Sequence, residues 1–111
     1  MKVQETQIYE LEYYIAENGK APLIGWMRKL DNAAKAKITT KIDNLSSGNF
    51  GNCKSLGRGL YELKIDYGPG YRVYYSQIGK KVLLLIVGGD KGTQRKDIKN
   101  AALCLEAYHE N

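Results

Sequence analysis

The stretch LYELKIDYGPGYRVYYSQIGKKVLLLIVG, residues 60–88, decides the fold. Apolar and polar residues alternate along Leu60–Asp66 and Tyr71–Gln77, and a period of two is typical of β-strands. A third run, Val82–Gly88, is apolar at nearly every position, which indicates an inner strand that is covered on both faces. Short connections that contain glycine join the three runs. We therefore expect an antiparallel meander of three strands.

Two helices are expected ahead of these strands. Pro22 suits the first turn of a helix, where its missing N–H costs nothing. Asp31 or Asn32 can cap a second helix, which the sequence Ser46-Ser47-Gly48 ends. The apolar residues recur at helical spacing, with Leu23, Trp26, Met27 and Leu30 in the first helix and Ala34, Ile38, Ile42 and Leu45 in the second. The pair is interpreted as a helical hairpin.

The two ends of the chain complete the expected fold. The run Ile8–Ile15 is rich in β-favouring residues and is predicted to be a strand. Thr93 can cap a final helix that has Asp97 in its first turn. Its apolar face would be Ile98, Ala101, Ala102, Leu105 and Tyr108. These elements predict an α+β fold in one domain, residues 1–111, ordered β-α-α-β-β-β-α, with an antiparallel sheet packed against the helical hairpin and the C-terminal helix.

Composition excludes several classes of protein. No run approaches the roughly 20 apolar residues that a bilayer span needs, and Met1–Glu5 holds no apolar leader, so we expect a cytoplasmic protein. Cys53 and Cys104 stand far apart and are interpreted as free thiols. With His109 as the one histidine, the usual zinc sets and histidine-dependent nucleophiles lack their parts. We expect no metal and no cofactor.

Positive charge is concentrated in one part of the sequence. The net charge is +5, but residues 53–99 hold ten Lys and Arg residues against the four carboxylates of Glu62, Asp66, Asp90 and Asp97. Basic patches of this kind point to polyanions, although a solvated surface could account for part of the excess. Nucleic acid is the favoured class of partner.

Strand alternation gathers the residues that could do chemistry. Side chains alternate across a strand, so Glu62, Lys64, Arg72 and Tyr74 are expected on one sheet face, with Lys91 at its edge. Lys91 also precedes a helix N-terminus, and such a terminus attracts phosphate. The arrangement resembles a cleft for a phosphodiester backbone, with tyrosines available to stack on bases. The alternatives are that Glu62 and Lys64 are merely solvated and that Arg72 stacks on a tyrosine for packing.

Four sequence blocks in order resemble a known family. They are Asn49–Gly51, Gly59–Ile65, Tyr67–Tyr75 and Gly88–Ile98, and the likeness extends upstream through Glu17–Pro22 and the helical hairpin. Together they look like the HigB-like addiction module killer proteins, a branch of the RelE/ParE toxin superfamily. The resemblance covers nearly the whole chain.

This resemblance implies a toxin of a type II toxin–antitoxin module. Such a toxin is neutralised by a cognate antitoxin, here expected to be HigA-like with a helix-turn-helix domain, and would meet operator DNA only through that antitoxin. RelE-type members cut messenger RNA on the ribosome with the RNA 2′-hydroxyl as nucleophile. By similarity, Arg72 and Lys91 would contact the scissile phosphate, and Lys64 would lie close to it. No membrane partner is implied.

The remaining roles are less fixed. Glu62 is favoured as the general base, with Lys64 as the alternative, and Tyr74 is expected to stack on a base or orient a nucleotide. The other RNA-binding candidates are Lys54, Arg58, Gln94, Arg95 and Lys96. RelE itself has a basic residue in place of Glu62 and a tyrosine in place of Asp97, so its proton-transfer scheme cannot be copied.

Two other functions fit the same sequence. A ParE-like inhibitor of DNA gyrase would have the same fold and no nuclease activity, because function lies in the site and not in the fold. A degenerate toxin would keep only antitoxin binding and act as a regulator. The presence of Glu62, Lys64, Arg72 and Lys91 on one inferred surface favours the ribonuclease.

Overall fold

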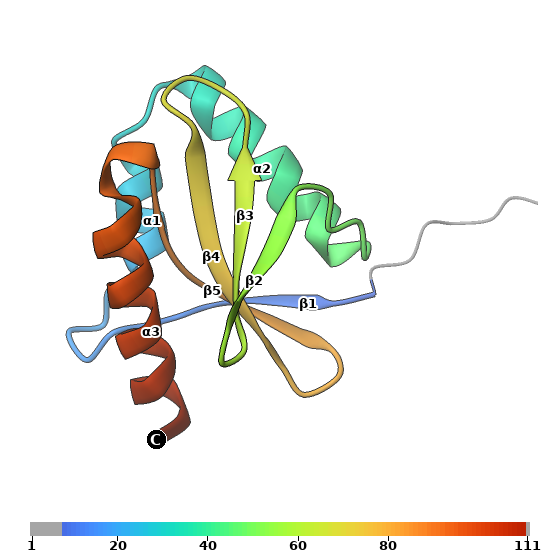
Figure 1. Cartoon of the computed structure of the whole chain (residues 1–111), viewed down its shortest axis with the longest axis vertical. Helices are drawn as coiled ribbons and strands as arrows, with labels where there is room; N and C mark the ends of the chain where they lie inside the picture. The colour runs from blue at the N-terminus through green and yellow to red at the C-terminus, as the bar shows by residue number, and fades with distance from the viewer. Residues whose placement is uncertain (1–7, 111) are drawn as a thin grey trace, which may run out of the picture.

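Five strands form one mixed sheet in the order β1-β5-β4-β3-β2 (Figure 1). The computed structural model describes residues 8–110, so the expectation that concerned Met1–Glu5 lies outside the described residues. The elements are β1 Glu10–Tyr13, α1 Pro22–Arg28, α2 Asn32–Ser46, β2 Cys53–Gly57, β3 Leu60–Ile65, β4 Tyr71–Ile78, β5 Val82–Gly89, the short 3₁₀ helix η1 Lys91–Thr93, and α3 Gln94–Glu110. The α+β class and the helical hairpin are confirmed.

The order and direction of the strands correct the expected topology in two ways. β1 pairs with β5 in parallel, so the sheet is mixed and not antiparallel throughout. A strand that was not expected, β2, pairs antiparallel with β3 and forms the other edge. The parallel pairing arises because the chain does not turn back directly after β1 but passes through α1 and α2 and then continues at the opposite edge.

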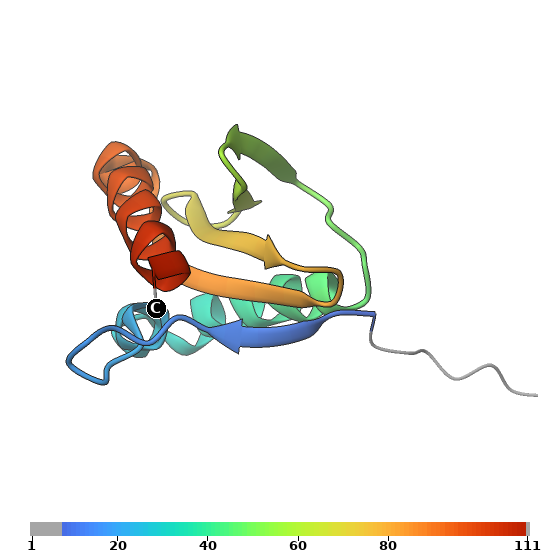
Figure 2. The ribbon, with the colours of Figure 1, turned by 90° about the horizontal axis from the view of Figure 1, so that it is seen from below.

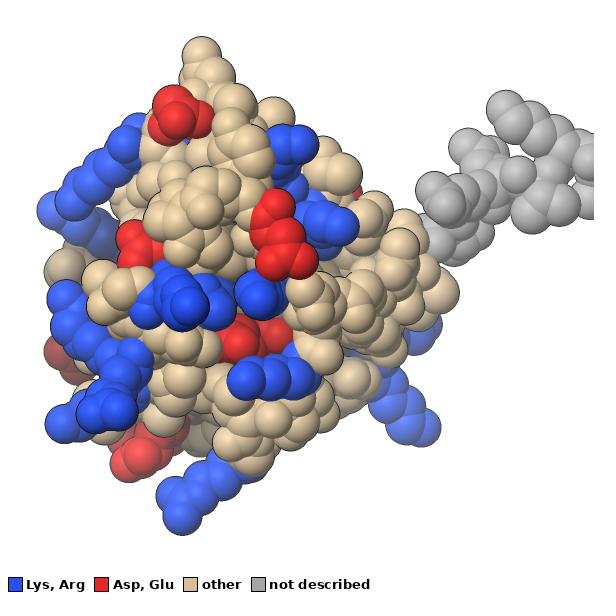
Figure 3. All heavy atoms as spheres, turned by 45° about the horizontal axis from the view of Figure 1, so that its top comes forward, with Lys and Arg blue, Asp and Glu red and all other residues tan. Residues whose placement is uncertain are grey.

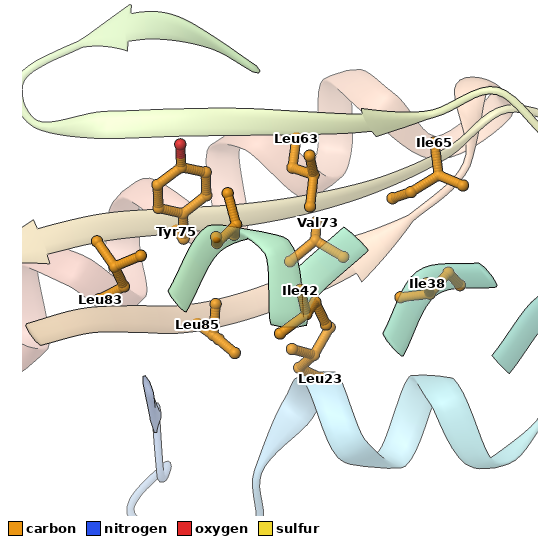
Figure 4. Packing of buried hydrophobic residues seen from close by; sticks show 10 residues of the cluster. Leu23, Ile38, Ile42, Leu63, Ile65, Val73, Tyr75, Leu83 and Leu85 are labelled. Atoms are coloured by element: carbon orange, nitrogen blue, oxygen red, sulfur yellow. The ribbon is translucent and has the colours of Figure 1, made fainter. Parts of the chain in front are cut away.

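One face of the sheet packs on the helical hairpin. Leu23 of α1 and Ile38 and Ile42 of α2 meet the apolar side chains of the strands in a buried cluster (Figure 4). The strand residues of this cluster are Leu63, Ile65, Val73, Tyr75, Leu83 and Leu85. They occupy alternate positions along each strand, so these three strands present one apolar face to the hairpin.

The opposite face packs on α3. Figure 2 shows the sheet lying between α3 on one side and the helical hairpin on the other. Tyr74, Leu84 and Ile86 pack there against Ala101 and Leu105 of α3. β5 therefore contributes buried residues to both faces, as its unbroken apolar run predicts. In the described residues, no helix is long and apolar enough to cross a membrane.

Two adjacent glycines at the end of β5 allow close packing on both faces. A Cβ atom at Gly88 would overlap the ring of Trp26, and one at Gly89 would overlap the carboxylate of Asp97. Trp26 belongs to α1 and Asp97 to α3, so each glycine makes room for one helix. The pair fixes where α1 and α3 sit relative to the end of the sheet.

Aspartate side chains cap α2, as the sequence predicts, and the 3₁₀ turn before α3. Asp31 caps α2, since its Oδ1 accepts the backbone N–H of Ala34 at 2.8 Å. Asp90 caps the 3₁₀ turn η1, which precedes the C-terminal helix and ends at Thr93. The Asp90 carboxylate accepts hydrogen bonds from the backbone N–H groups of Gly92 and Thr93 in this turn. The side-chain oxygen of Thr93 in return accepts the backbone N–H of Asp90.

Candidate functional site

Arg72 lies at the centre of the candidate site. It stands on β4 between Lys64 on β3 and Gly89 on β5, which are its register partners. Its relative exposure is 6%. The Nη1 atom donates to the carbonyl oxygen of Gly70 at 2.7 Å, while Nε has no hydrogen-bond partner among the described residues. The guanidinium is therefore held in place with part of its donor capacity unused.

Glu62 supplies the buried negative charge beside this cation. Its Oε2 lies 3.7 Å from Nε of Arg72 and accepts hydrogen bonds from the Tyr74 hydroxyl at 3.2 Å and from Nε2 of Gln94 at 2.8 Å. The relative exposure of Glu62 is 3%. Because these partners surround the oxygen and solvent does not reach it, the geometry suits a counter-ion that aims Arg72 better than a base that meets a substrate.

Tyr74 is buried, which corrects its expected role. Its relative exposure is 0%, and it packs under α3 with Leu84 and Ala101. Burial raises the pKa of the Tyr74 phenol, and the neighbouring Glu62 carboxylate raises it further. A ring in this position cannot stack on a nucleobase. Tyr74 instead positions Glu62 by donating to it.

Three cations converge on an open pocket at this end of the sheet. Lys64, Arg72 and Lys91 line it together with the β3–β4 turn, and its volume is about 390 Å³. Gly70 separates two of them: a Cβ atom there would lie 3.2 Å from Nη1 of Arg72 and 3.8 Å from Cβ of Lys91. Figure 3, which brings this end of the molecule forward, shows Lys and Arg side chains gathered around acidic ones. We call this pocket the cationic pocket.

Asp66 is a site residue whose role sequence reasoning missed. Its Oδ1 lies 3.5 Å from Nζ of Lys64, and both residues line the cationic pocket. The alternation that placed Glu62 and Lys64 on one face placed Asp66 there too, so the signal was present. The carbonyl of Gly70, which fixes Arg72, left no signal in the sequence because a backbone acceptor depends on turn geometry.

The junction before α3 provides a charge but not a free anion site. Gly92 N–H donates to Oδ1 of Asp90 at 2.8 Å, and Thr93 N–H donates to the same oxygen at 3.2 Å. These N–H groups are the ones that were expected to attract phosphate. Since they are already bonded, this junction contributes the ammonium group of Lys91 to the site.

The other expected RNA-binding residues divide into three groups. Gln94 is turned inward and holds Glu62, and Lys54 on the edge strand β2 reaches within 3.9 Å of Oε1 of the same carboxylate. Arg95 and Lys96 are exposed in the first turn of α3. Arg58, at a φ of 55°, lies in the β2–β3 turn beside the C-terminal part of α3 and away from the cationic pocket.

Cysteine chemistry is separate from this site. Cys53 and Cys104 are free, as predicted, and burial raises the pKa of both thiols. Cys53 belongs to β2 and Cys104 to α3, and neither lines the cationic pocket. Among residues 8–110, no group of three or more His, Cys, Asp or Glu side chains is placed to hold a metal ion.

Comparison with known proteins corrects the resemblance drawn from the sequence. The family model that matches is "Phage derived protein Gp49-like (DUF891)", over residues 25–109. This family is separate from RelE and HigB, so the expected HigB-like membership is wrong. An "Uncharacterized protein" of Haemophilus influenzae (strain ATCC 51907 / DSM 11121 / KW20 / Rd) is 52% identical over 82 residues, which are 73% of this chain and 83% of that protein. The matched family is toxin-like and compatible with a toxin–antitoxin role.

Proposed function

Since the chain belongs to the phage-derived Gp49-like family, we propose that it is the toxin of a toxin–antitoxin pair and that its cationic pocket cleaves messenger RNA. The observation that carries this proposal is the convergence of Lys64, Arg72 and Lys91 on one open pocket, with Arg72 fixed from behind by Glu62. Arg72 lines the pocket with its guanidinium anchored to the Gly70 carbonyl, and a fixed cation suits a phosphate that gains charge during reaction.

The proposed reaction is an internal transfer at phosphorus. The 2′-oxygen of the RNA attacks the adjacent phosphorus and forms a new P–O bond, and the bond to the 5′-oxygen breaks. The products are a 2′,3′-cyclic phosphate and a 5′-hydroxyl. Arg72 and Lys91 stabilise the negative charge that develops on the phosphorane oxygens.

Lys64 is the proposed proton acceptor. Its side chain is 44% exposed and lines the pocket, whereas the buried Glu62 does not reach it. To act in this way Lys64 first releases one proton to water; its amine then takes the proton of the 2′-hydroxyl, and Lys91 or water protonates the leaving 5′-oxygen. This assignment replaces Glu62, the base favoured by the sequence, because Glu62 is not among the residues that line the cationic pocket.

A toxin of this kind needs a partner that keeps it inactive in growing cells. We propose a cognate antitoxin as that partner and the translating ribosome as the place where messenger RNA is met. Contact with operator DNA would then pass through the antitoxin. The excess of positive charge around the pocket would favour an acidic partner segment and RNA alike.

The test is primer extension on a messenger RNA in a bacterial translation extract. Lys91→Ala is the main variant because Lys91 is exposed and its loss leaves the buried network intact. We expect the wild type to create new 5′ ends within translated codons and Lys91→Ala to reduce them about 100-fold. Lys80→Ala removes the same charge from the β4–β5 turn at the opposite end of the sheet and should cleave normally.

A second variant tests the role of Arg72, and one outcome of the experiment would separate a nuclease from a toxin that acts by binding alone. Arg72→Lys keeps a buried cation but loses the hydrogen bond to Gly70, so it should fold and cleave poorly. If the wild type arrests growth in cells yet produces no cleavage with or without ribosomes, the nuclease proposal is wrong. The protein would then be a toxin that acts by binding alone, and DNA gyrase would be the first target to assay.

A further inference from the structure

A second pocket adjoins the cationic pocket on the side of α2. It lies between α2 and the end of β3, has a volume of about 500 Å³, and is lined by Lys37, Thr40 and Lys41 together with Asn52, Lys64 and Asp66. Lys64 and Asp66 line both pockets. The two hollows therefore share a wall, and we call the one on this side the α2 pocket.

The sequence of α2 explains why its lysines reach this place. Ile38 and Ile42 turn into the core, so Lys37 and Lys41, one residue before each of them, lie at the margin of the buried stripe. The two lysines are four residues apart and therefore share a helix face. Nζ of Lys37 lies 5.2 Å from the ring centre of Tyr67, which itself lines the cationic pocket.

Asp66 is the acidic residue in the shared wall. Its side chain is 73% exposed, and its carboxylate pairs with Lys64 and accepts a hydrogen bond from Nδ2 of Asn52 at 3.4 Å. Around it stand five cations of the two pockets, Lys37, Lys41, Lys64, Arg72 and Lys91. A solvated helix face would explain why Lys37 and Lys41 are exposed. It would not explain why they line a hollow that shares a wall with the cationic pocket.

We propose that the α2 pocket binds the RNA backbone next to the scissile phosphate, with Lys37 and Lys41 as the phosphate-binding groups. The proposal also gives Asp66 a role: it repels the polyanion and holds Lys64, so it limits affinity for RNA. The inference rests on the proposed function, and it adds α2 to the binding surface, to which the sequence assigned no residue of that helix. Single-stranded RNA fits because neighbouring phosphates of one strand can occupy neighbouring cationic hollows.

The test measures binding separately from cleavage. The probe is a fluorescent single-stranded 2′-O-methyl RNA of about twelve nucleotides, which lacks the nucleophile, and the readout is anisotropy over a range of salt concentrations. The double variant Lys37→Ala, Lys41→Ala should bind about tenfold more weakly, and the slope of log affinity against log salt should fall by about 1.4 for two lost phosphate contacts. Lys80→Ala, Lys81→Ala is the matched control, because it removes two exposed lysines from the β4–β5 turn at the far end of the sheet.

Asp66→Asn should change the affinity for RNA in the opposite direction. Removing this carboxylate should tighten binding by about threefold or more at low salt, whereas Glu106→Gln on the exposed surface of α3 removes the same charge without that effect. Equal weakening by the α2 pair and the β4–β5 pair would show a general charge effect and overturn the proposal, while cleavage by the wild type would leave the proposed function standing. If the wild type binds no RNA at all, this inference fails, while the proposed function is still decided by the cleavage assay.

Discussion

At the residue scale, the main feature of the site is the buried ion pair between Arg72 and Glu62. The energetics of a buried pair differ from those of a surface pair. Both residues are less than one tenth exposed, and Tyr74 and Gln94 complete the hydrogen bonding of the carboxylate. Removing one partner of a buried pair leaves an uncompensated charge, whose cost exceeds what the pair itself contributes. The pair therefore ties the integrity of the fold to the position of the proposed phosphate-binding cation.

Loss of the Glu62 carboxylate should destabilise the protein more than loss of its neighbour's hydroxyl. We expect Glu62→Ala to lower the free energy of unfolding by about 3–5 kcal/mol, because Arg72 stays buried without a counter-ion. Tyr74→Phe removes one hydrogen bond and should lower it by about 1 kcal/mol, with cleavage largely retained. Urea unfolding measures both. A fully folded Tyr74→Phe protein without activity would contradict a positioning role and imply that the hydroxyl acts on the substrate.

Gly89 offers a second prediction at this scale. A methyl group there would meet the carboxylate of Asp97, which packs directly on the strand, so Gly89→Ala should lower stability by about 1–3 kcal/mol. Gly25 is the matched control: it lies in α1 with open space around its added Cβ, and Gly25→Ala should raise stability by about 0.5–1 kcal/mol. Thermal unfolding compares the two. A tolerated alanine at residue 89 would mean that Asp97 can move away.

Sequence reasoning found the site residues but not their depth. Alternation along β3 and β4 placed Glu62, Lys64 and Arg72 on one face, because a period of two is a local property of strands. How α3 covers that face is a tertiary property. The helix lies over Tyr74 and Glu62 and leaves the Lys64 end open, which no pattern in these strands encodes.

At the scale of elements, the turn between β5 and α3 sets the position of Lys91. Asp90 caps η1 by accepting from Gly92 and Thr93, and Lys91 is the first residue of that turn. Asp31 caps α2 in a similar way but belongs to a helix start that contributes nothing to the cationic pocket. The two caps form a natural comparison between stability and activity.

Asp90→Ala and Asp31→Ala should cost similar stability and differ in activity. Each removes the acceptor at a helix start, and each should lower the free energy of unfolding by about 1–2 kcal/mol. Asp90→Ala should also reduce RNA cleavage roughly tenfold to a hundredfold, because Lys91 loses its fixed position near the phosphate. The measurements are urea unfolding and primer extension at a temperature where both variants are folded. Equal cleavage by the two variants would argue against a positioned Lys91.

The elements that sequence reasoning missed are those held by partners and not by local preference. The β2 sequence Cys-Lys-Ser-Leu-Gly carries little β propensity, and it becomes a strand because β3 offers a free edge to Cys53–Ser55. The 3₁₀ turn η1 is similarly a product of the Asp90 cap. The long helices and the apolar β5 were predicted because their periodicity is strong enough to be read without partners.

For the molecule as a whole, the main error in the predicted topology was to expect a fully antiparallel sheet, because β1 pairs in parallel with β5. A strand at the start of the chain can pair on either edge of a meander and in either direction, and its own sequence does not choose. The choice follows from burial: β5 is apolar on both faces and lies inside the sheet, with β1 on one side and β4 on the other. The resulting three layers place one buried tyrosine in each core, Tyr74 under α3 and Tyr75 against the hairpin.

These two tyrosines predict a loss of stability in alkali. Burial raises the pKa of both phenols, with Glu62 adding to the effect at Tyr74 and Cys53 at Tyr75. A raised pKa in the folded state means that their contribution is complete below the unfolded value of about 10 and is lost as pH rises above it. The free energy of unfolding should fall by about 1.4 kcal/mol per pH unit for each tyrosine. Denaturant unfolding between about pH 9 and 12 should show this slope, and Tyr74→Phe and Tyr75→Phe should each reduce it by about 1.4 kcal/mol per pH unit. Tyr13→Phe, at an exposed position of β1, is the control. A wild-type slope that both core variants leave unchanged would mean that other groups cause the alkaline transition and that the two cores do not protect their phenols.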